Sequence, residues 1–227
     1  MDEDLERVLQ SAARLQLLVP DAVLVGGSAA AYYAGHRASY DHDHVLPDLA
    51  ERYGAVLDAV EASDGWATSV RASSPPFTIL GTLDGVEAGL RQLRRSRALE
   101  VAVVEIAGGQ RLTVPTIEET LRVKAYLVVQ RNQTRDYLDV VALAEAMGSE
   151  RAVRTLLGID DYYMDRSGEP GAVSTIVAQR LAQPDPRDTR TIRELPRYKG
   201  LVPRWHDWSV VERACGELAT AMLERGA

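Results

Sequence analysis

The sequence has few of the features that would place it in several large protein classes. It contains a single cysteine, Cys215, which excludes an internal disulfide and any multi-cysteine zinc site. It has no run of about 18 apolar residues, so we expect no transmembrane helix and no association with the membrane. The opening residues MDEDLERVLQ are acidic where a secretory signal would be basic and then apolar. A cytoplasmic location is the resulting expectation.

An excess of positive charge is also absent. The formal net charge is −7, which argues against a protein that coats nucleic acid without specificity. Basic side chains are nevertheless concentrated in two stretches, at residues 91–97 and 187–204. Each stretch is either an ordinary solvated surface or a track for the phosphates of a nucleic acid.

The hydrophobic pattern predicts an α/β half followed by a helical half, with a boundary near Pro115. In the first half we expect helices at 4–18, 29–34 and 48–62, and strands at 22–25, 39–46, 66–70, 77–83, 86–93, 99–106 and 111–114. In the second half we expect helices at 116–130, 134–147, 171–182 and 209–224, a further helix capped by Ser149, and an ordered loop at 183–208. Residues 1–115 should therefore form a small mixed sheet flanked by helices, and residues 116–227 a helical domain.

Asp41 and Asp43 are the first candidates for chemistry. They lie in a predicted strand, where residues two apart point to the same face. Two adjacent carboxylates repel each other unless a cation lies between them, and Mg²⁺ is typically held by one or two carboxylates together with substrate phosphates. We therefore predict a metal site for Mg²⁺, with Mn²⁺ as an alternative ion.

A Gly26-Gly27-Ser28 turn precedes this strand. It follows a short apolar run and should open a helix with Ser28 as the N-cap. Glycines let the backbone approach a phosphate closely, and a helix N-terminus favours anions. The turn and the carboxylate pair together predict chemistry on a nucleoside triphosphate.

Three histidines and an arginine lie next to the two aspartates in the sequence. His42 and His44 alternate with the aspartates and should point to the opposite face of the strand, which argues against one zinc site made of all four residues. His36 and Arg37 come just before the strand. They either reach a triphosphate or merely solvate the turn.

A second group of charged residues begins after Pro115. Lys124 and Arg131 are two helical turns apart and should share a face, while Asp136 and Asp139 follow in the next predicted helix. The group is either a salt-bridge network between packed helices or a grip for the triphosphate in which Asp136 orients one of the cations. A third carboxylate that activates an acceptor hydroxyl would be Glu87 or Glu105, and the sequence does not choose between them.

The pattern GGSA…GHRxSxDxD followed by K…R…RDxxD resembles the AbiEii/AbiGii-type nucleotidyltransferase toxins, including the MenT-like toxins of toxin–antitoxin systems. The wider group is the polymerase-beta-like nucleotidyltransferase superfamily. The resemblance covers residues 22–46 and 116–145. This sequence differs from the family in having His42 between the two aspartates and His44 after the second.

The resemblance implies a role for each matching residue. The phosphate loop would include Gly27 and Ser28, Ser39 would lie at the catalytic strand, and Asp41 and Asp43 would be the metal ligands. Nucleotide contact would come from Lys124, and the acidic position of the RDxxD segment would be Asp136. Arg37 and Arg131 complete the predicted nucleotide-binding set.

The resemblance also implies an activity. Such proteins transfer a nucleoside monophosphate (NMP) from a nucleoside triphosphate (NTP) to an RNA, notably the 3′ end of tRNA, and a cognate antitoxin is usually encoded alongside. Two alternatives remain open at the level of sequence. The acceptor could be a protein hydroxyl, or the chain could be a non-catalytic binding module on the same fold.

Overall fold

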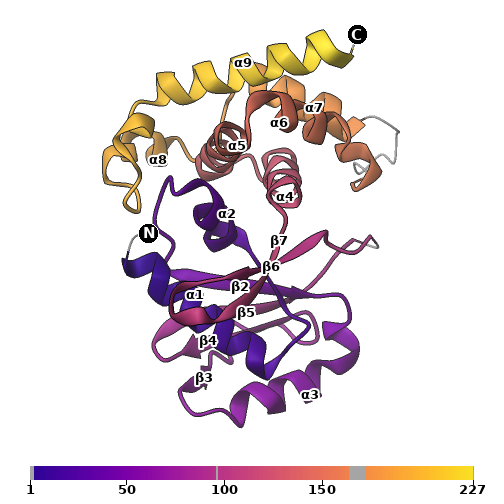
Figure 1. Ribbon diagram of the computed structural model, residues 1–227, viewed down its shortest axis with the longest axis vertical. Coiled ribbons are helices and arrows are strands. Elements are labelled where there is room, and N and C mark those ends of the chain that lie inside the picture. Colours follow the sequence, from indigo (N-terminus) through magenta and orange to yellow (C-terminus); the bar gives the residue numbers. More distant parts are fainter. Residues whose placement is uncertain (1–2, 96, 164–171, 227) are drawn as a thin grey trace. The chain divides into compact units, whose positions relative to one another are not determined.

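The chain folds into two compact units in a computed structural model that describes residues 3–95, 97–163 and 172–226 (Figure 1). Unit 1 contains the described residues up to Tyr32 together with Ala38–Thr116. Unit 2 contains Tyr33–Arg37 and the described residues from Ile117 onward. The chain thus enters unit 2 for a short segment before it returns to complete unit 1.

Unit 1 is built on a five-stranded mixed sheet. In spatial order its strands are β1 (Val23–Val25), β2 (Asp41–Leu46), β5 (Val86–Gln92), β4 (Thr78–Leu83) and β3 (Trp66–Thr68). The central strands β2 and β5 are parallel, and the other neighbouring pairs are antiparallel. The predicted α/β class with a small mixed sheet is therefore confirmed.

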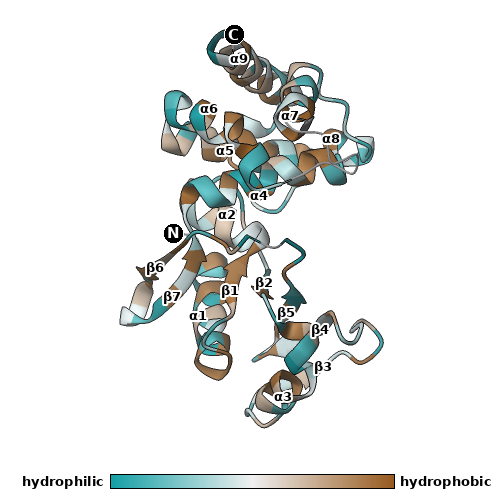
Figure 2. Cartoon of the chain, turned by 90° about the vertical axis from the view of Figure 1, so that its right-hand side faces the viewer, coloured by the Kyte–Doolittle hydropathy of each residue, from teal (hydrophilic) through white to brown (hydrophobic). Residues whose placement is uncertain are grey.

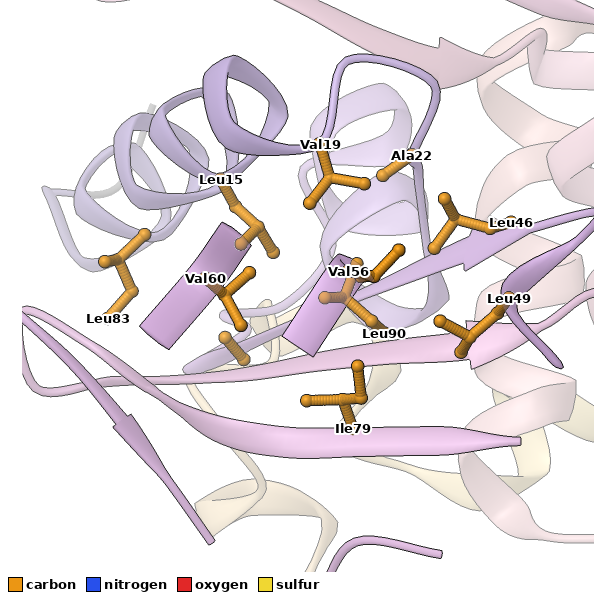
Figure 3. Close-up of a cluster of buried hydrophobic side chains, with 11 residues drawn as sticks. Leu15, Val19, Ala22, Leu46, Leu49, Val56, Val60, Ile79, Leu83 and Leu90 are labelled. Carbon is orange, nitrogen blue, oxygen red and sulfur yellow. The ribbon is translucent and has the colours of Figure 1, made fainter. Parts of the chain in front are cut away.

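One face of this sheet is buried under two helices, α1 (Glu3–Leu18) and α3 (Leu49–Glu61). Figure 3 shows the apolar cluster between these helices and the sheet, which also includes residues on the connections. The helices and their ends contribute Leu15, Val19, Leu49, Val56 and Val60, and the strands contribute Leu46, Ile79, Leu83, Ala88 and Leu90. Because side chains alternate along a strand, the residues between these point to the other face, which bears the candidate site.

Unit 1 also contains a separate two-stranded sheet. Its antiparallel strands are β6 (Val101–Glu105) and β7 (Arg111–Pro115), joined through a short 3₁₀ turn at Ala107–Gly109. Gly108 and Gly109 both have positive φ angles, which glycine adopts without strain. The strands predicted at 99–106 and 111–114 are thus both present, and they pair with each other. The edge strand of the larger sheet, β1, is hydrophobic along its length (Figure 2).

Unit 2 is helical in its described part. Its helices are α4 (Ile117–Gln130), α5 (Thr134–Met147), α6 (Ser149–Leu157), α7 (Ala172–Ala182), α8 (Thr189–Arg193) and α9 (Trp208–Gly226), with 3₁₀ turns at Ile159–Asp161, Leu195–Arg197 and Pro203–Trp205. Residue 171, the predicted start of one helix, lies outside the described residues.

The segment 183–208, predicted as an ordered loop, is ordered and contains the short helix α8. It is tied to the connection between α4 and α5 by polar contacts. The backbone N–H and the hydroxyl of Thr134 both donate to Asp188 Oδ1, at 2.7 and 2.9 Å, and the Asn132 side chain donates to the Asp185 carbonyl at 2.6 Å. The segment therefore packs on its own unit.

Two predicted caps are wrong. Helix α2 (Gly26–Ala34) begins at Gly26, so Ser28 is a buried residue of its first turn. Its hydroxyl donates to the Asp41 carbonyl at 2.5 Å and so ties the helix to β2. Ser149 is likewise the first residue of α6, whose cap is Gly148. Gly26, the first residue of α2, and Gly148, the cap of α6, both have a positive φ that glycine adopts readily.

Candidate functional site

Asp41 and Asp43 lie on the same face of β2, as their spacing predicts. The burial of the strand alternates, with both aspartates half-buried and His42 and His44 completely buried. The histidines therefore belong to the core face of the sheet and the aspartates to the opposite face. Four ligands of one metal ion cannot converge from these two faces.

The carboxylate of Asp43 has three close neighbours in unit 1: Gly26, Gly89 and Arg91. One is the start of α2, where a Cβ added to Gly26 would lie 3.8 Å from Asp43 Oδ2. Another is Gly89 on β5, where an added Cβ would lie only 2.4 Å from Asp43 Oδ1. The third is Arg91, whose Nε donates to Asp43 Oδ1 at 3.0 Å. Asp43 thus occupies space that only glycine leaves open.

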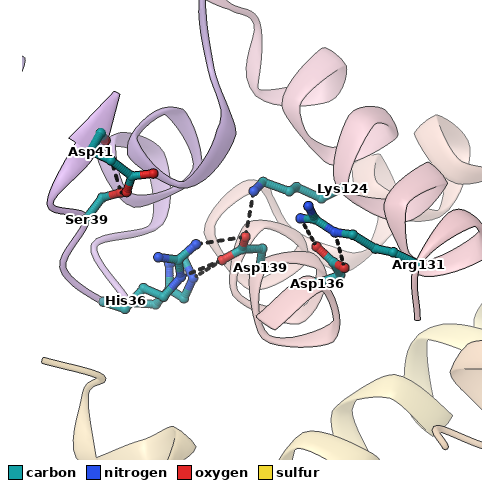
Figure 4. Close-up of polar contacts among 8 residues, drawn as sticks. His36, Ser39, Asp41, Lys124, Arg131, Asp136 and Asp139 are labelled. Atoms are coloured by element: carbon teal, nitrogen blue, oxygen red, sulfur yellow. Dashed lines mark hydrogen bonds and ion pairs between the residues drawn. The ribbon is translucent and has the colours of Figure 1, made fainter. Parts of the chain in front are cut away.

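Asp41 is held by serines and faces a second acidic residue. Ser39 Oγ lies 3.4 Å from Asp41 Oδ1, a long hydrogen bond that Figure 4 shows beside the strand. In the parallel pairing of β2 with β5, Asp41 is the partner of Glu87, so the two side chains share a face. Glu105 belongs to β6 in the separate sheet. Of the two candidate third carboxylates, Glu87 is the one placed beside the pair.

These residues line a cavity of about 500 Å³ on the face of the sheet opposite the hydrophobic core. Asp41, Asp43, Glu87 and Arg91 are its charged residues. The remaining lining consists of His42 and of small, hydroxyl-bearing or apolar residues: Ala67, Thr68, Ser69, Ala72, Leu80, Gly81, Thr82, Ala88 and Gly89. A cavity lined by three carboxylates and two glycines can admit a substrate close to the acidic residues.

The acidic residues have the donor chemistry for a hard divalent cation. Carboxylate oxygens are the ligands that Mg²⁺ prefers, and it commonly uses one or two of them with water and substrate phosphates as the rest. Among the residues that the structure describes, no group of three or more His, Cys, Asp or Glu side chains is arranged to hold a metal ion alone. The pair Asp41 and Asp43 therefore fits a cation that shares its ligands with a phosphate.

The histidines behind the aspartates are neutral. Burial lowers the pKa of His42 to about 4, against an opposing effect of Asp41, and burial lowers the pKa of His44 well below its ordinary value. His42 Nε2 lies 3.0 Å from the Ser11 hydroxyl. The strand that carries the carboxylates is thus backed by two uncharged imidazoles.

A second polar cluster lies inside unit 2 and centres on Asp139 (Figure 4). Three cationic or basic side chains contact this fully buried carboxylate. Lys124 Nζ lies 2.7 Å away, His36 Nε2 2.7 Å, and Arg37 donates from Nε at 2.8 Å and from Nη2 at 3.0 Å. His36 and Arg37 are themselves buried, at 2% and 6% exposure, so the reading in which they merely solvate the turn is wrong.

The protonation states in this cluster follow from its geometry. Burial alone would raise the pKa of Asp139, but Arg37 and Lys124 outweigh it and hold that pKa well below the usual range. Burial lowers the pKa of His36 and of Lys124, and Asp139 opposes both shifts. An ionised Asp139 can only accept hydrogen bonds, so the proton of His36 lies on Nε2.

Arg131 and Asp136 form the remaining predicted pair. The guanidinium donates from Nε at 2.7 Å and from Nη2 at 2.6 Å to the two oxygens of Asp136, in a bidentate arrangement. Asp136 is fully buried, whereas the Arg131 side chain is 34% exposed. Asp136 therefore orients Arg131, and the use of this pair to grip a triphosphate stays a prediction.

The two basic stretches are partly neutralised. In the first, Arg91 pairs with Asp43, and Arg95 donates to the carbonyls of Arg97 and Ala98. In the second, Arg190 pairs with Glu194 and Arg204 with Glu145. Arg94, Arg193 and Arg197 are exposed. The charge available to a nucleic acid is therefore smaller than the sequence suggests.

Three residues of these clusters were not selected from the sequence. Gly89 and Arg91 touch Asp43 only because β5 lies beside β2, a pairing that no local pattern signals. Asp139 was noted only as a neighbour of Asp136, although its position three residues later repeats the helical spacing that brings both carboxylates near the basic residues of α4. The i, i+3 spacing of the RDxxD segment was the available signal.

Comparison with known proteins gives two kinds of similarity. No protein-family model matches the chain. It is 30% identical, over 97% of its length, to the heme uptake protein MmpL11 of Mycobacterium tuberculosis, and 35% identical, over 58% of its length, to the mycolic acid-containing lipids exporter MmpL11 of Mycolicibacterium smegmatis. The chain spans only 23% and 13% of these two proteins. In its described part, no helix is long and apolar enough to cross a bilayer.

Solved structures resemble the chain over nearly its whole length. A Helicobacter pylori protein assigned as a nucleotidyltransferase has a TM-score of 0.56 with 17% identity and covers 99% of this chain and 97% of its own. The H. pylori protein JHP933 has a TM-score of 0.54 with 16% identity and covers 99% of this chain and 94% of its own. The chain therefore has a nucleotidyltransferase fold.

Proposed function

We propose that the chain is a metal-dependent nucleotidyltransferase that moves an NMP from an NTP to a hydroxyl group, with an RNA 3′ end, most of all that of tRNA, as the acceptor. The observation that carries the proposal is the placement of Asp41 and Asp43 on the face of β2 opposite the hydrophobic core, beside the first turn of α2. A carboxylate pair next to unpaired helix N–H groups suits a metal-bound triphosphate.

In unit 1, some residues would bind the phosphates and others the cation. The first-turn N–H groups of Gly26, Gly27 and Ser28 would donate hydrogen bonds to a phosphate, and Asp41 and Asp43 would hold the cation against the same phosphates. A bound Mg²⁺ or Mn²⁺ would neutralise charge that develops on the phosphate oxygens. Ser28 and Ser39 would keep Asp41 in position through the contacts described above.

The transfer itself is a displacement at phosphorus. The acceptor hydroxyl oxygen attacks the α-phosphorus in line, the bond from that phosphorus to the bridging oxygen breaks, and pyrophosphate leaves with the bonding electrons. The hydroxyl proton needs an acceptor. Glu87 is the carboxylate placed beside Asp41 for that role, and we assign it as the general base.

The basic residues of unit 2 are paired with buried carboxylates, which limits their contact with a nucleotide. Lys124 is 2% exposed and held by Asp139, so a contact between Lys124 and the nucleotide requires it to leave that partner. Arg131 keeps part of its side chain exposed while Asp136 orients it. We retain Arg37, Lys124 and Arg131 as proposed nucleotide-binding residues, with Asp136 as the residue that orients Arg131, the most accessible of the three.

The toxin role, the tRNA acceptor and a cognate antitoxin rest on the resemblance of the GGSA…DxD and RDxxD segments to AbiEii/AbiGii-type toxins. The exposed arginines of the stretch 187–204 would serve as an RNA track or as the docking surface of the antitoxin. The partial match to mycobacterial MmpL11 proteins adds no assignment of substrate, because it covers less than a quarter of their length.

The test uses the full chain with each of the four NTPs labelled at the α-phosphate, Mg²⁺ and total tRNA. We expect label on the RNA that ribonuclease removes and protease does not, and no label from γ-labelled NTP. Label with the opposite sensitivity would favour a protein acceptor. No transfer from any NTP to either acceptor would contradict the proposal.

Asp43→Ala is the matched test in cells. Loss of the metal ligand should lower transfer by about 100-fold or more and abolish any growth arrest that the wild-type chain causes. Asp58→Ala, a change on the surface of α3, is the control and should leave both unchanged. Growth arrest that survives Asp43→Ala would favour a non-catalytic binding module.

A further inference from the structure

Arg91 is the one cation of the carboxylate cavity among the residues that line it. Its Nε donates at 3.0 Å to Asp43 Oδ1, the same oxygen that lies over Gly89. Arg91 stands two residues after Gly89 on β5, so its side chain rises from the same face of the sheet as the carboxylates. In this structure the guanidinium thus supplies the positive charge next to Asp43.

The ion pair between Arg91 and Asp43 is exposed enough to break and re-form easily. The two side chains are 45% and 31% exposed, and ion pairs of this exposure contribute little because water competes for both charges. The Asp139 cluster is the contrast within the same chain, since Lys124 and Arg37 are there 2% and 4% exposed. Arg91 can therefore leave Asp43 at small cost, whereas separating Lys124 or Arg37 from Asp139 would cost far more because it leaves buried charges without compensation.

A metal ion and the guanidinium compete for the same oxygen. A divalent cation bound to the Asp43 carboxylate would lie close to the Arg91 guanidinium, and two cations at one carboxylate repel each other. When the ion enters with its triphosphate, new anionic oxygens arrive in the cavity together with it. A guanidinium matches phosphate oxygens with its planar fork, and a triphosphate brings several negative charges to the cavity where Asp43 brings one.

We propose that Arg91 is a phosphate-binding residue that rests on Asp43 in the empty cavity and moves to a phosphate of the NTP when the metal ion takes its place. The inference rests on the proposed function, because it needs a metal-bound triphosphate as ligand. It has two consequences of opposite sign. Arg91 weakens the binding of a metal ion without nucleotide, and it strengthens the binding of the metal–nucleotide complex.

The first consequence is measured with Mn²⁺ alone and the full chain, by the loss of the electron paramagnetic resonance signal of the free ion. Arg91→Gln removes the competing charge and should tighten Mn²⁺ binding by about three- to fivefold, the range of an exposed ion pair. Arg91→Lys keeps a charge and should stay near the wild-type value. Arg94→Gln, an exposed arginine three residues away, controls for the loss of one positive charge and should have less effect.

The second consequence is measured with a non-hydrolysable NTP analogue in the presence of saturating Mn²⁺, by calorimetry on the same variants. Arg91→Gln should weaken analogue binding by about tenfold or more, as expected for the loss of a hydrogen bond to a charged group. Arg91→Lys should recover part of the loss, and Arg94→Gln should match the wild type. Circular dichroism and unfolding midpoints confirm that the variants fold.

The outcomes separate this inference from the proposed function. Tighter Mn²⁺ binding together with weaker analogue binding in Arg91→Gln supports the inference. Tighter Mn²⁺ binding with unchanged analogue binding would overturn it and leave Arg91 as a surface charge, with the proposed nucleotide site intact. Unchanged Mn²⁺ binding would also overturn it. If the wild-type chain binds neither ligand, the proposed function fails first.

Discussion

The side chain that is missing at Gly89 decides where the Asp43 carboxylate can lie. A Cβ there would sit 2.4 Å from Asp43 Oδ1, closer than any real contact, so Gly89→Ala must push the carboxylate away from β5. We expect NMP transfer to fall by about tenfold or more, while the free energy of unfolding changes by about 1 kcal/mol or less, because the displaced atom is the end of a short side chain.

Gly54→Ala is the matched control for this substitution. Gly54 lies inside α3, and nothing stands within 4 Å of its added Cβ. The change should raise the free energy of unfolding by about 0.5–1 kcal/mol through helix propensity and leave transfer unchanged. Chemical denaturation and the transfer assay measure both variants. Wild-type activity in Gly89→Ala would show that the position of Asp43 over β5 is irrelevant.

The burial of the single residue His42 makes the stability of the fold depend on pH. Its pKa is about 4 in the folded chain and 6.5 ordinarily, so between these values the unfolded chain binds a proton that the folded chain does not. Its contribution is complete above pH 6.5 and falls by about 3 kcal/mol as the pH drops to 4. The lowered pKa values of His44 and His36 act in the same direction.

The measurement is urea unfolding of the wild type and of His42→Gln between pH 7.5 and 4.5. We expect the wild type to lose stability steadily below pH 6.5 and the variant to lose clearly less over the same interval. Parallel curves for the two proteins would mean that His42 is not buried in its neutral form.

At the scale of elements, the strand β2 was predictable because its alternation is carried by its own residues. The spacing of Asp41 and Asp43 predicted their shared face, and the same alternation placed His42 and His44 behind them. The start of α2 was predicted wrongly at Ser28, because the serine hydroxyl bonds to the Asp41 carbonyl across the sheet. A distant partner can thus override the local preference that favours a cap.

The helices α4 and α5 are joined by the Asp139 cluster, which supports a prediction for stability. Asp139→Asn removes the charge that Lys124 and Arg37 share and leaves two buried cations without compensation. We expect the free energy of unfolding to fall by about 3 kcal/mol or more. Glu194→Gln, which breaks the exposed pair with Arg190, should have far less effect. A small loss in Asp139→Asn, measured by denaturant unfolding, would contradict the buried network.

At the scale of the whole molecule, composition and periodicity predicted an α/β half before a helical half, and the fold class is that of the H. pylori structures. The excursion of Tyr33–Arg37 into unit 2 had no counterpart in the sequence-based division at residue 115. Nothing local distinguishes His36 and Arg37 as buried, because their partner Asp139 is about a hundred residues away in the chain. Long-range partners of this kind are what a single sequence hides.

The central claim is that Asp41 and Asp43 share a divalent cation with a triphosphate at the start of α2. The most direct measurement is the anomalous difference density of Mn²⁺ in crystals of the full chain grown with a non-hydrolysable NTP. We predict a peak within bonding distance of both carboxylates, with phosphate oxygens against the backbone of Gly26–Ser28. A nucleotide bound elsewhere, or a chain saturated with Mn²⁺ that has no peak at β2, would contradict the account.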